Sequence, residues 1–139
     1  MATLLINIDV DDLEKGIRFY LAALGLKQGR SLGADACELL GASSPIYLLE
    51  NRKGTRPFEG ATDGRDYGRH WTPVHLDFAV EDIEAGVARA VSAGAALEGR
   101  IEKRAWGRLA RLSDPFGNGF CILQFEGRGY DELIDTPSA

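Results

Sequence analysis

An internal repeat is the feature of this sequence that most constrains its fold. Shifting the chain by 70 positions, from residue 6 to residue 76, aligns INIDVDDLEKG (Ile6–Gly16) with LDFAVEDIEAG (Leu76–Gly86). In both copies apolar residues alternate with other residues at a period of two and then recur at helical spacing. The repeat therefore predicts two copies of a strand followed by a helix. Asp11, three residues before Glu14, and the matching Glu81 are the predicted helix starts.

Three short segments of strand character follow each predicted helix. They are Lys27–Leu32, Ala34–Leu40 and Pro45–Glu50 in the first copy, and Ala96–Lys103, Arg108–Ser113 and Gly119–Phe125 in the second. The turn sequence DPFGNG, Asp114–Gly119, predicts a tight connection between the last two strands. The order is therefore βαβββ twice, which is an α+β fold.

The repeat also predicts the domain organisation. We expect a single domain with module one at about residues 1–50, a connecting loop at about 51–72, module two at about 73–126 and a C-terminal tail at 127–139. The connecting loop is polar, contains Gly and Pro, and has no periodicity. A loop of this length in a compact domain is usually functional or disordered.

Composition excludes several classes of partner. The net charge of -5 and the pI near 5.0 argue against nucleic-acid binding, which needs clustered Lys and Arg. No apolar run has the length of a membrane span, and the first residues do not resemble a secretion signal. Cys37 and Cys121 form no metal-binding or redox pair motif. We therefore expect a cytoplasmic protein with reduced thiols and no membrane partner.

The doubled βαβββ unit, together with VDDLEKGIRFYLAALGL, VHLDFAVEDIEAG and DPFGNGFCILQF, resembles the glyoxalase, bleomycin-resistance and extradiol dioxygenase superfamily, also called vicinal oxygen chelate. The resemblance implies that each module curls into a half-barrel, so that two modules form an incomplete β-barrel around a cavity. It also implies a small-molecule ligand and a homodimer. The activity stays open, because this fold carries isomerases, lyases, dioxygenases and antibiotic-sequestering proteins.

The same resemblance implies where metal ligands would lie. Metal-dependent members place one ligand on the first and one on the last strand of each module. Those positions fall on Leu5 and Tyr47 in module one and on His75 and Cys121 in module two. A catalytic divalent site generally needs about three protein ligands. We therefore expect no metal or other cofactor; if a divalent metal is bound, His75 is its ligand, and Asp77 could substitute only with a third donor from elsewhere.

Two interpretations remain open for each polar residue of the expected cavity. His75 can bind ligand or act as a general base, or it can be a hydrogen-bonded cavity residue. Asn7 and Asp77 are equivalent in the repeat, so we expect them near each other at the module junction. Trp71 and Trp106 can stack on a flat ligand or pack the barrel rim. The full expected lining is Leu5, Asn7, Tyr47, His75, Asp77, Trp106 and Cys121, with Leu49 and Leu123.

These residues support three hypotheses about function. The first is a metal-independent protein that binds a flat or amphiphilic small molecule, similar to the bleomycin-resistance type. The second is a lyase, isomerase or dioxygenase in which His75 is the catalytic base or metal ligand and Asp77 orients it. The third is a regulatory domain that retains only the scaffold, with a cavity filled by its own side chains.

Overall fold

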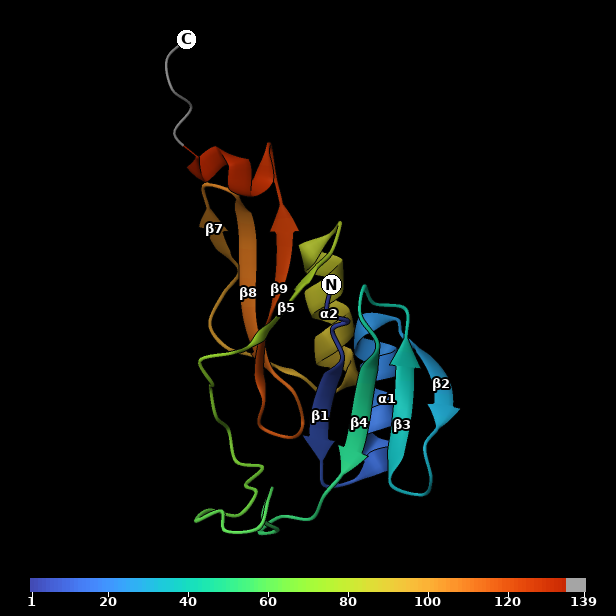
Figure 1. Ribbon diagram of the computed structural model, residues 1–139. Coiled ribbons are helices and arrows are strands. Elements are labelled where there is room, and N and C mark those ends of the chain that lie inside the picture. Colours follow the sequence, from blue (N-terminus) through green and yellow to red (C-terminus); the bar gives the residue numbers. More distant parts are fainter. Residues whose placement is uncertain (135–139) are drawn as a thin grey trace.

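Two successive units of related topology make up the computed structural model, which describes residues 1–134 (Figure 1): the first is βαβββ, and in the second the strand after the helix is divided in two. The first unit consists of β1 (Ile6–Val10), α1 (Leu13–Leu24), β2 (Lys27–Ser31), β3 (Ala36–Leu40) and β4 (Ile46–Glu50). The second consists of β5 (Leu76–Ala79), α2 (Ile83–Ala93), β6 (Ala96–Leu97), β7 (Glu102–Arg104), β8 (Gly107–Ser113) and β9 (Gly119–Phe125). A 3₁₀ helix, η1 (Gly129–Leu133), follows.

The two units build two sheets with the same strand order. Sheet one has the order β1-β4-β3-β2, and sheet two has the order β5-β9-β8-β6 with β7 also paired to β8. The first strand of each unit is parallel to the last, β1 to β4 and β5 to β9, and the remaining pairs are antiparallel. The prediction of two βαβββ modules is therefore confirmed. The two sheets are not closed into a barrel, as Figure 1 shows.

Three details of the predicted elements are wrong. The single strand predicted at Ala96–Lys103 is two strands, β6 and β7, because Gly99 between them adopts a left-handed φ of 83°. Strand β5 begins at Leu76, so His75 precedes it. The residues that cap the helices are Asp12 and Asp82, one position after the predicted ones.

These aspartates cap the helices with a backbone hydrogen bond. The Asp12 side chain accepts a hydrogen bond from the Lys15 backbone N–H at 3.0 Å, and Asp82 accepts one from Ala85 at 3.1 Å. The short carboxylate at the cap position reaches the third residue of the helix, which satisfies an otherwise free donor. Both caps occupy the same place in the repeat.

Two glycines of the repeat allow the helices to approach their sheets closely. A Cβ atom on Gly16 would lie 3.1 Å from Val10 Cγ1 and 3.2 Å from Leu48 Cδ1. A Cβ atom on Gly86 would lie 3.3 Å from Val80 Cγ2. Both glycines therefore meet the same packing requirement, the close contact of each helix with the end of the first strand of its unit (Val10) or the residue just after it (Val80).

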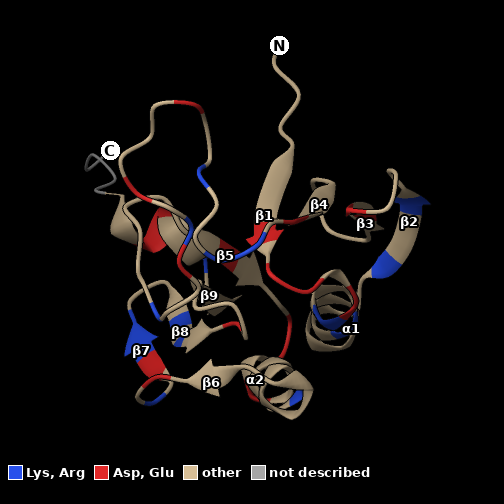
Figure 2. Cartoon of the chain, turned by 90° about the horizontal axis from the view of Figure 1, so that it is seen from below, with Lys and Arg blue, Asp and Glu red and all other residues tan. Residues whose placement is uncertain are grey.

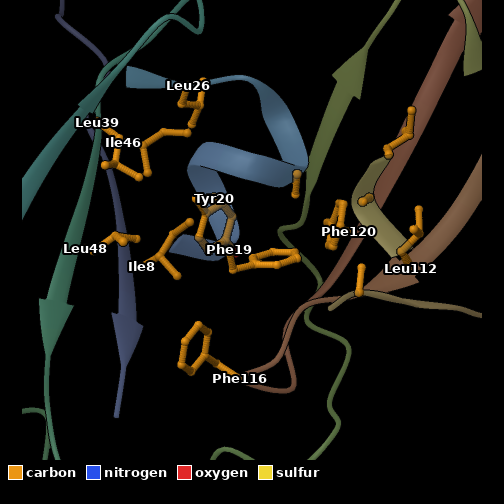
Figure 3. Packing of buried hydrophobic residues seen from close by; sticks show 14 of the residues in the cluster. Ile8, Phe19, Tyr20, Leu26, Leu39, Ile46, Leu48, Leu112, Phe116 and Phe120 are labelled. Carbon is orange, nitrogen blue, oxygen red and sulfur yellow. The ribbon is translucent and has the colours of Figure 1, made fainter. Parts of the chain in front are cut away.

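The core lies between the sheets and includes both helices. Helix α1 packs on sheet one and also against α2. Figure 3 shows Phe19 and Tyr20 of α1 between the side chains of sheet one, among them Ile8, and Phe120 of sheet two. Phe116, from the turn between β8 and β9, is fully buried in the same cluster. One continuous apolar core therefore joins the two modules.

The segment between the modules contains neither helix nor strand apart from one bridge, between His70 and Asn118. Figure 2 shows basic and acidic segments interspersed over both modules. No helix within residues 1–134 combines the length and the apolar character needed to cross a membrane. Of the expected C-terminal tail, residues 135–139 lie outside the described residues.

Candidate ligand-binding site

A cleft of about 690 Å³ lies between β1 on one side and β5 with the start of β9 on the other. This volume is within the range of ~300–1,000 Å³ that is typical of small-molecule pockets. Most of its wall is apolar, including Leu5, Ile6, Ile8, Val74, Leu76 and Phe120. Its polar groups are Asn7, Asp9, Thr72, His75 and Asn118. An apolar cleft with a few polar groups at its edge suits an organic molecule that is mostly apolar.

A chain of polar contacts joins His75 to β9. His75 Nδ1 lies 3.0 Å from Asp77 Oδ1, and each side chain is one-third exposed. Asp77 is the register partner of Cys121 on the parallel strand β9. Donor atoms of these three residues all lie within 4.8 Å of one another. When Nδ1–H donates to the carboxylate, Nε2 of His75 is left as the hydrogen-bond acceptor.

The Cys121 thiol is held in its protonated form. Burial, followed by the nearby Asp77 carboxylate, raises the pKa of Cys121 from 9.0 to about 11. The nucleophilic form of cysteine is the thiolate, which is scarce at neutral pH when the pKa is raised in this way. Cys121 therefore acts as a small buried residue that contacts Asp77.

This arrangement predicts slow alkylation of Cys121. At pH 8 we expect iodoacetamide to modify Cys121 in the folded protein at least about 100-fold more slowly than in the urea-unfolded chain, because the raised pKa leaves less thiolate and burial restricts access of the reagent. Mass spectrometry of the Cys121 peptide measures the rate. Asp77→Asn removes the negative charge and should react faster than the unsubstituted protein, whereas equal rates would contradict the assigned role of Asp77.

A second polar row crosses the open face of sheet one. Tyr47 donates a hydrogen bond to Glu38 Oε2 at 3.1 Å, and Arg30 binds both carboxylate oxygens of Glu38 at 2.8 and 3.0 Å. The Arg30 guanidinium, its backbone N–H and the Tyr47 hydroxyl hold the pKa of Glu38 at about 2, below its usual 4.5. Asn7 on β1 is the register partner of Tyr47. The row therefore runs from the edge of the cleft to β2.

The Glu38 interactions predict an acid-sensitive contribution to stability. Since the pKa of Glu38 is lowered in the folded protein, its contribution is present above pH 4.5 and is lost as the pH falls toward about 2. Glu38→Gln should therefore be less stable than the unsubstituted protein at pH 6. The difference in free energy of unfolding between the two proteins should shrink as the pH falls through this window. Urea unfolding at pH 6, 4 and about 2.5 tests this, with Tyr47→Phe as a control that keeps the Arg30 pair. A gap that stays constant with pH would contradict the assignment.

The structure brings some of the expected lining residues to the cleft and places others elsewhere. Leu5, Asn7 and His75 line it. Tyr47, Leu49, Asp77, Cys121 and Leu123 occupy the strands beside it. Trp106 instead contacts Phe125 and Tyr130, with ring centroids 5.7 and 5.3 Å apart, at the far end of β8 and β9. Asp77 hydrogen-bonds to His75, and the expected proximity of Asp77 to Asn7 stays a prediction.

Sequence reasoning missed two polar residues that line the cleft and share a buried partner. Tyr20 of α1 and Asn118 both line it, and both bind the buried carboxylate of Asp114. The Tyr20 hydroxyl donates to Asp114 Oδ2 at 2.5 Å. Burial and this carboxylate raise the pKa of Tyr20, so the phenol stays neutral. The aspartate of the DPFGNG turn was the available signal, but nothing in the sequence pairs it with a helix of the other module.

The residues present do not fit the metal site that the resemblance implies. Leu5 offers no donor atom, and the Tyr47 hydroxyl is bound to Glu38. The capable donors, His75, Asp77 and Cys121, all come from module two. The two-module set of ligands is therefore not reproduced here.

Comparison with known proteins matches this chain to a family model and to several curated relatives. The family model described as a glyoxalase-like domain matches residues 5–123. The anthracycline biosynthesis protein DauV of Streptomyces sp. strain C5 is 30% identical over 133 residues, which cover 96% of this chain and 44% of DauV. DnrV of Streptomyces peucetius, also described as an anthracycline biosynthesis protein, is 31% identical and covers 90% of this chain and 42% of its own length. The chain therefore spans less than half the length of these relatives.

Solved structures show the same fold. The fosfomycin resistance protein FosX of Listeria monocytogenes superposes with a TM-score of 0.71 at 17% identity, covering 96% of this chain and 98% of FosX. TnmS3, an antibiotic-binding protein from Streptomyces sp. CB03234, superposes with a TM-score of 0.64 at 24% identity, covering 91% and 97%. At these identities the likeness concerns the fold alone.

Proposed function

The chain belongs to the glyoxalase-like domain family, and on that premise we propose that it binds a planar, mostly apolar small molecule without a divalent metal. The observation that carries the proposal is that the residues at the implied metal-ligand positions make other contacts. Tyr47 is engaged with Glu38 in module one, and the Cys121 thiol is held protonated beside Asp77 in module two. The two modules act as one unit in this proposal, because the cleft is lined by both.

The relatives suggest a class of ligand. DauV and DnrV are described as anthracycline biosynthesis proteins, and TnmS3 as an antibiotic-binding protein. Anthracyclines are fused-ring aromatic compounds with polar groups at the edge of the ring system. The cleft between β1 and β5 offers the complementary pattern, an apolar wall with Asn7, Thr72 and His75 at its border. A fused-ring aromatic compound with a polar edge is therefore the proposed ligand class.

Isothermal titration calorimetry of chelator-treated protein with an anthracycline tests the proposal. We expect a dissociation constant in the micromolar range or tighter, with chromatography recovering the ligand unchanged. Conversion of the ligand by the metal-free protein would contradict a binding function. Loss of binding after chelation, with recovery on adding a divalent metal, would contradict the metal-free site.

A second candidate is a lyase, isomerase or dioxygenase of the same superfamily that uses His75, with a divalent metal in the metal-dependent form. The contact of His75 Nδ1 with Asp77 favours it, because a carboxylate that orients an imidazole leaves Nε2 available as a base. In that case His75→Ala should abolish turnover while the fold persists. Unchanged turnover in this variant would remove the candidate. The third hypothesis, a scaffold with a filled cavity, is not favoured by an open cleft of about 690 Å³.

We also propose that two copies of the chain associate and that the protein is cytoplasmic. The sheets stay open in a single chain, and apolar residues on sheet one such as Leu40 are exposed. The relatives DauV and DnrV are more than twice as long as the matched region, which leaves room for a second such unit in one chain. Light scattering during gel filtration should give twice the mass of 15.1 kDa, and a monomeric mass would contradict the dimer. Fractionation of cells that express the untagged chain tests the location.

A further inference from the structure

The end of the connecting segment lies across the start of β9. The His70 backbone N–H donates to Gly117 O at 2.8 Å, and the Gly119 N–H donates to His70 O at 3.2 Å. The next residue, Trp71, lies directly on Gly119: a Cβ atom there would be 2.1 Å from Trp71 Cε3. Gly119 is therefore required for the indole to occupy this place.

Trp71 is held from two further sides. Its ring centroid is 4.6 Å from that of His75, with an angle of 35° between the planes. The guanidinium of Arg69 is 5.8 Å from the ring and is itself bound to Glu98, with Arg69 Nη2 at 2.5 Å from Oε1. These contacts fix an aromatic side chain that nevertheless remains 43% exposed. An exposed tryptophan that is fixed by its neighbours is a preorganised contact surface.

The position of Trp71 connects it to the cleft. Its neighbours His75, Thr72 and Gly119 all line the cleft, and the indole packs on His75 and Gly119 from outside this lining, at the rim of the cleft. On the opposite wall Leu5 is also exposed. A planar ring system in the cleft would therefore meet an apolar wall on one side and His75 on the other, with the exposed Trp71 indole beside His75 at the rim.

We propose that Trp71 is a specificity-determining residue of this site, whose indole stacks on the planar ring system of the ligand, and that Gly119 keeps the indole in place. This inference rests on the proposed ligand-binding function and extends it to a named contact. Stacking selects flat, π-rich molecules over aliphatic ones of equal size, because dispersion and quadrupole terms both favour parallel offset rings. Among the two tryptophans of the chain, Trp106 provides the matched control, since it packs in a separate aromatic cluster.

Titration calorimetry with an anthracycline tests the assignment in four single variants and one double variant. Trp71→Ala should weaken binding about 10-fold, within the range expected for loss of one aromatic stacking partner, and Trp71→Phe should recover part of the loss. Trp106→Ala should leave the affinity within about 2-fold of the original. Gly119→Ala should weaken binding in the same direction as Trp71→Ala. The double variant Trp71→Ala/Gly119→Ala should lose little more affinity than either of these single variants, because both changes remove the same contact.

The outcomes separate the inference from the proposed function. Binding by the unsubstituted protein with an unchanged affinity in Trp71→Ala would overturn the role of Trp71 alone. No binding by the unsubstituted protein would overturn the proposed function for this ligand class and the inference with it. Equal losses in Trp71→Ala and Trp106→Ala would also overturn the inference, since they would indicate a general loss of structure. Circular dichroism of each variant accompanies the titrations.

Discussion

Replacing Asp114 by alanine is expected to lower the free energy of unfolding by about 3–5 kcal/mol, because several buried donors lose their acceptor at once. The Asp114 carboxylate accepts hydrogen bonds from the Tyr20 hydroxyl, from the backbone N–H groups of Phe116 and Asn118, and from the Asn118 side chain. Asp114 is 5% exposed and Tyr20 is 3% exposed, so water cannot easily replace the lost partner. Urea unfolding monitored by circular dichroism measures the change.

Two variants control this prediction. Tyr20→Phe removes only the hydroxyl and should cost about 1–2 kcal/mol. Asn118→Ala leaves the contacts of Asp114 with Tyr20 and Phe116 in place and should cost a similar amount. Asp114→Ala should therefore exceed each of them clearly. A cost for Asp114→Ala below about 1 kcal/mol would show that the carboxylate does not join the two modules as described.

Leu5→Arg is expected to weaken binding of an anthracycline by about 30-fold or more, since it places a charged side chain in the apolar wall of the cleft, where burial of the charge is costly. Leu5 lines the cleft and is 52% exposed, so the change should affect the fold little. Leu133→Arg is the matched control, because Leu133 is 58% exposed and belongs to η1. Calorimetric titration of both variants gives the comparison.

The contrast between these two variants tests the place of binding. Loss of affinity in Leu5→Arg together with normal binding in Leu133→Arg would support binding in the cleft between β1 and β5. Unchanged affinity of Leu5→Arg for the anthracycline would indicate that the ligand binds outside this cleft. Melting temperatures of both variants should stay close to that of the unsubstituted protein, because surface substitutions change stability little.

The sequence was sufficient to predict the fold because the same local packing and capping residues occur in both copies of the repeat. Gly16 and Gly86 permit close helix packing in equivalent places, and Asp12 and Asp82 cap equivalent helices. Periodicity alone could not predict the break between β6 and β7, because the left-handed turn at Gly99 lies inside a stretch of strand character. Local patterns indicate elements well and indicate their interruptions less well.

The site was harder to predict because its contacts join distant parts of the chain. His75 and Asp77 lie two residues apart on one face of the chain, and this pair could be anticipated from alternation along an extended chain. Tyr20 and Asp114 are 94 positions apart, and no spacing rule links them. Trp106 and Trp71 have the same two interpretations in the sequence, stacking on a ligand or packing the barrel rim. In the structure the Trp71 ring contacts His75 of the cleft, whereas the Trp106 ring contacts Phe125. Such distinctions depend on how the two modules pack.

The measurement that tests the central claim most directly is the metal content of the untagged protein while it is bound to an anthracycline, determined by inductively coupled plasma mass spectrometry. The account predicts a complex with less than about 0.1 equivalent of any divalent metal, because Leu5 offers no donor and the Tyr47 hydroxyl is bound to Glu38. Close to one equivalent of iron, manganese, nickel or zinc in the complex would contradict it. That result would make the cluster of His75, Asp77 and Cys121 the candidate metal centre.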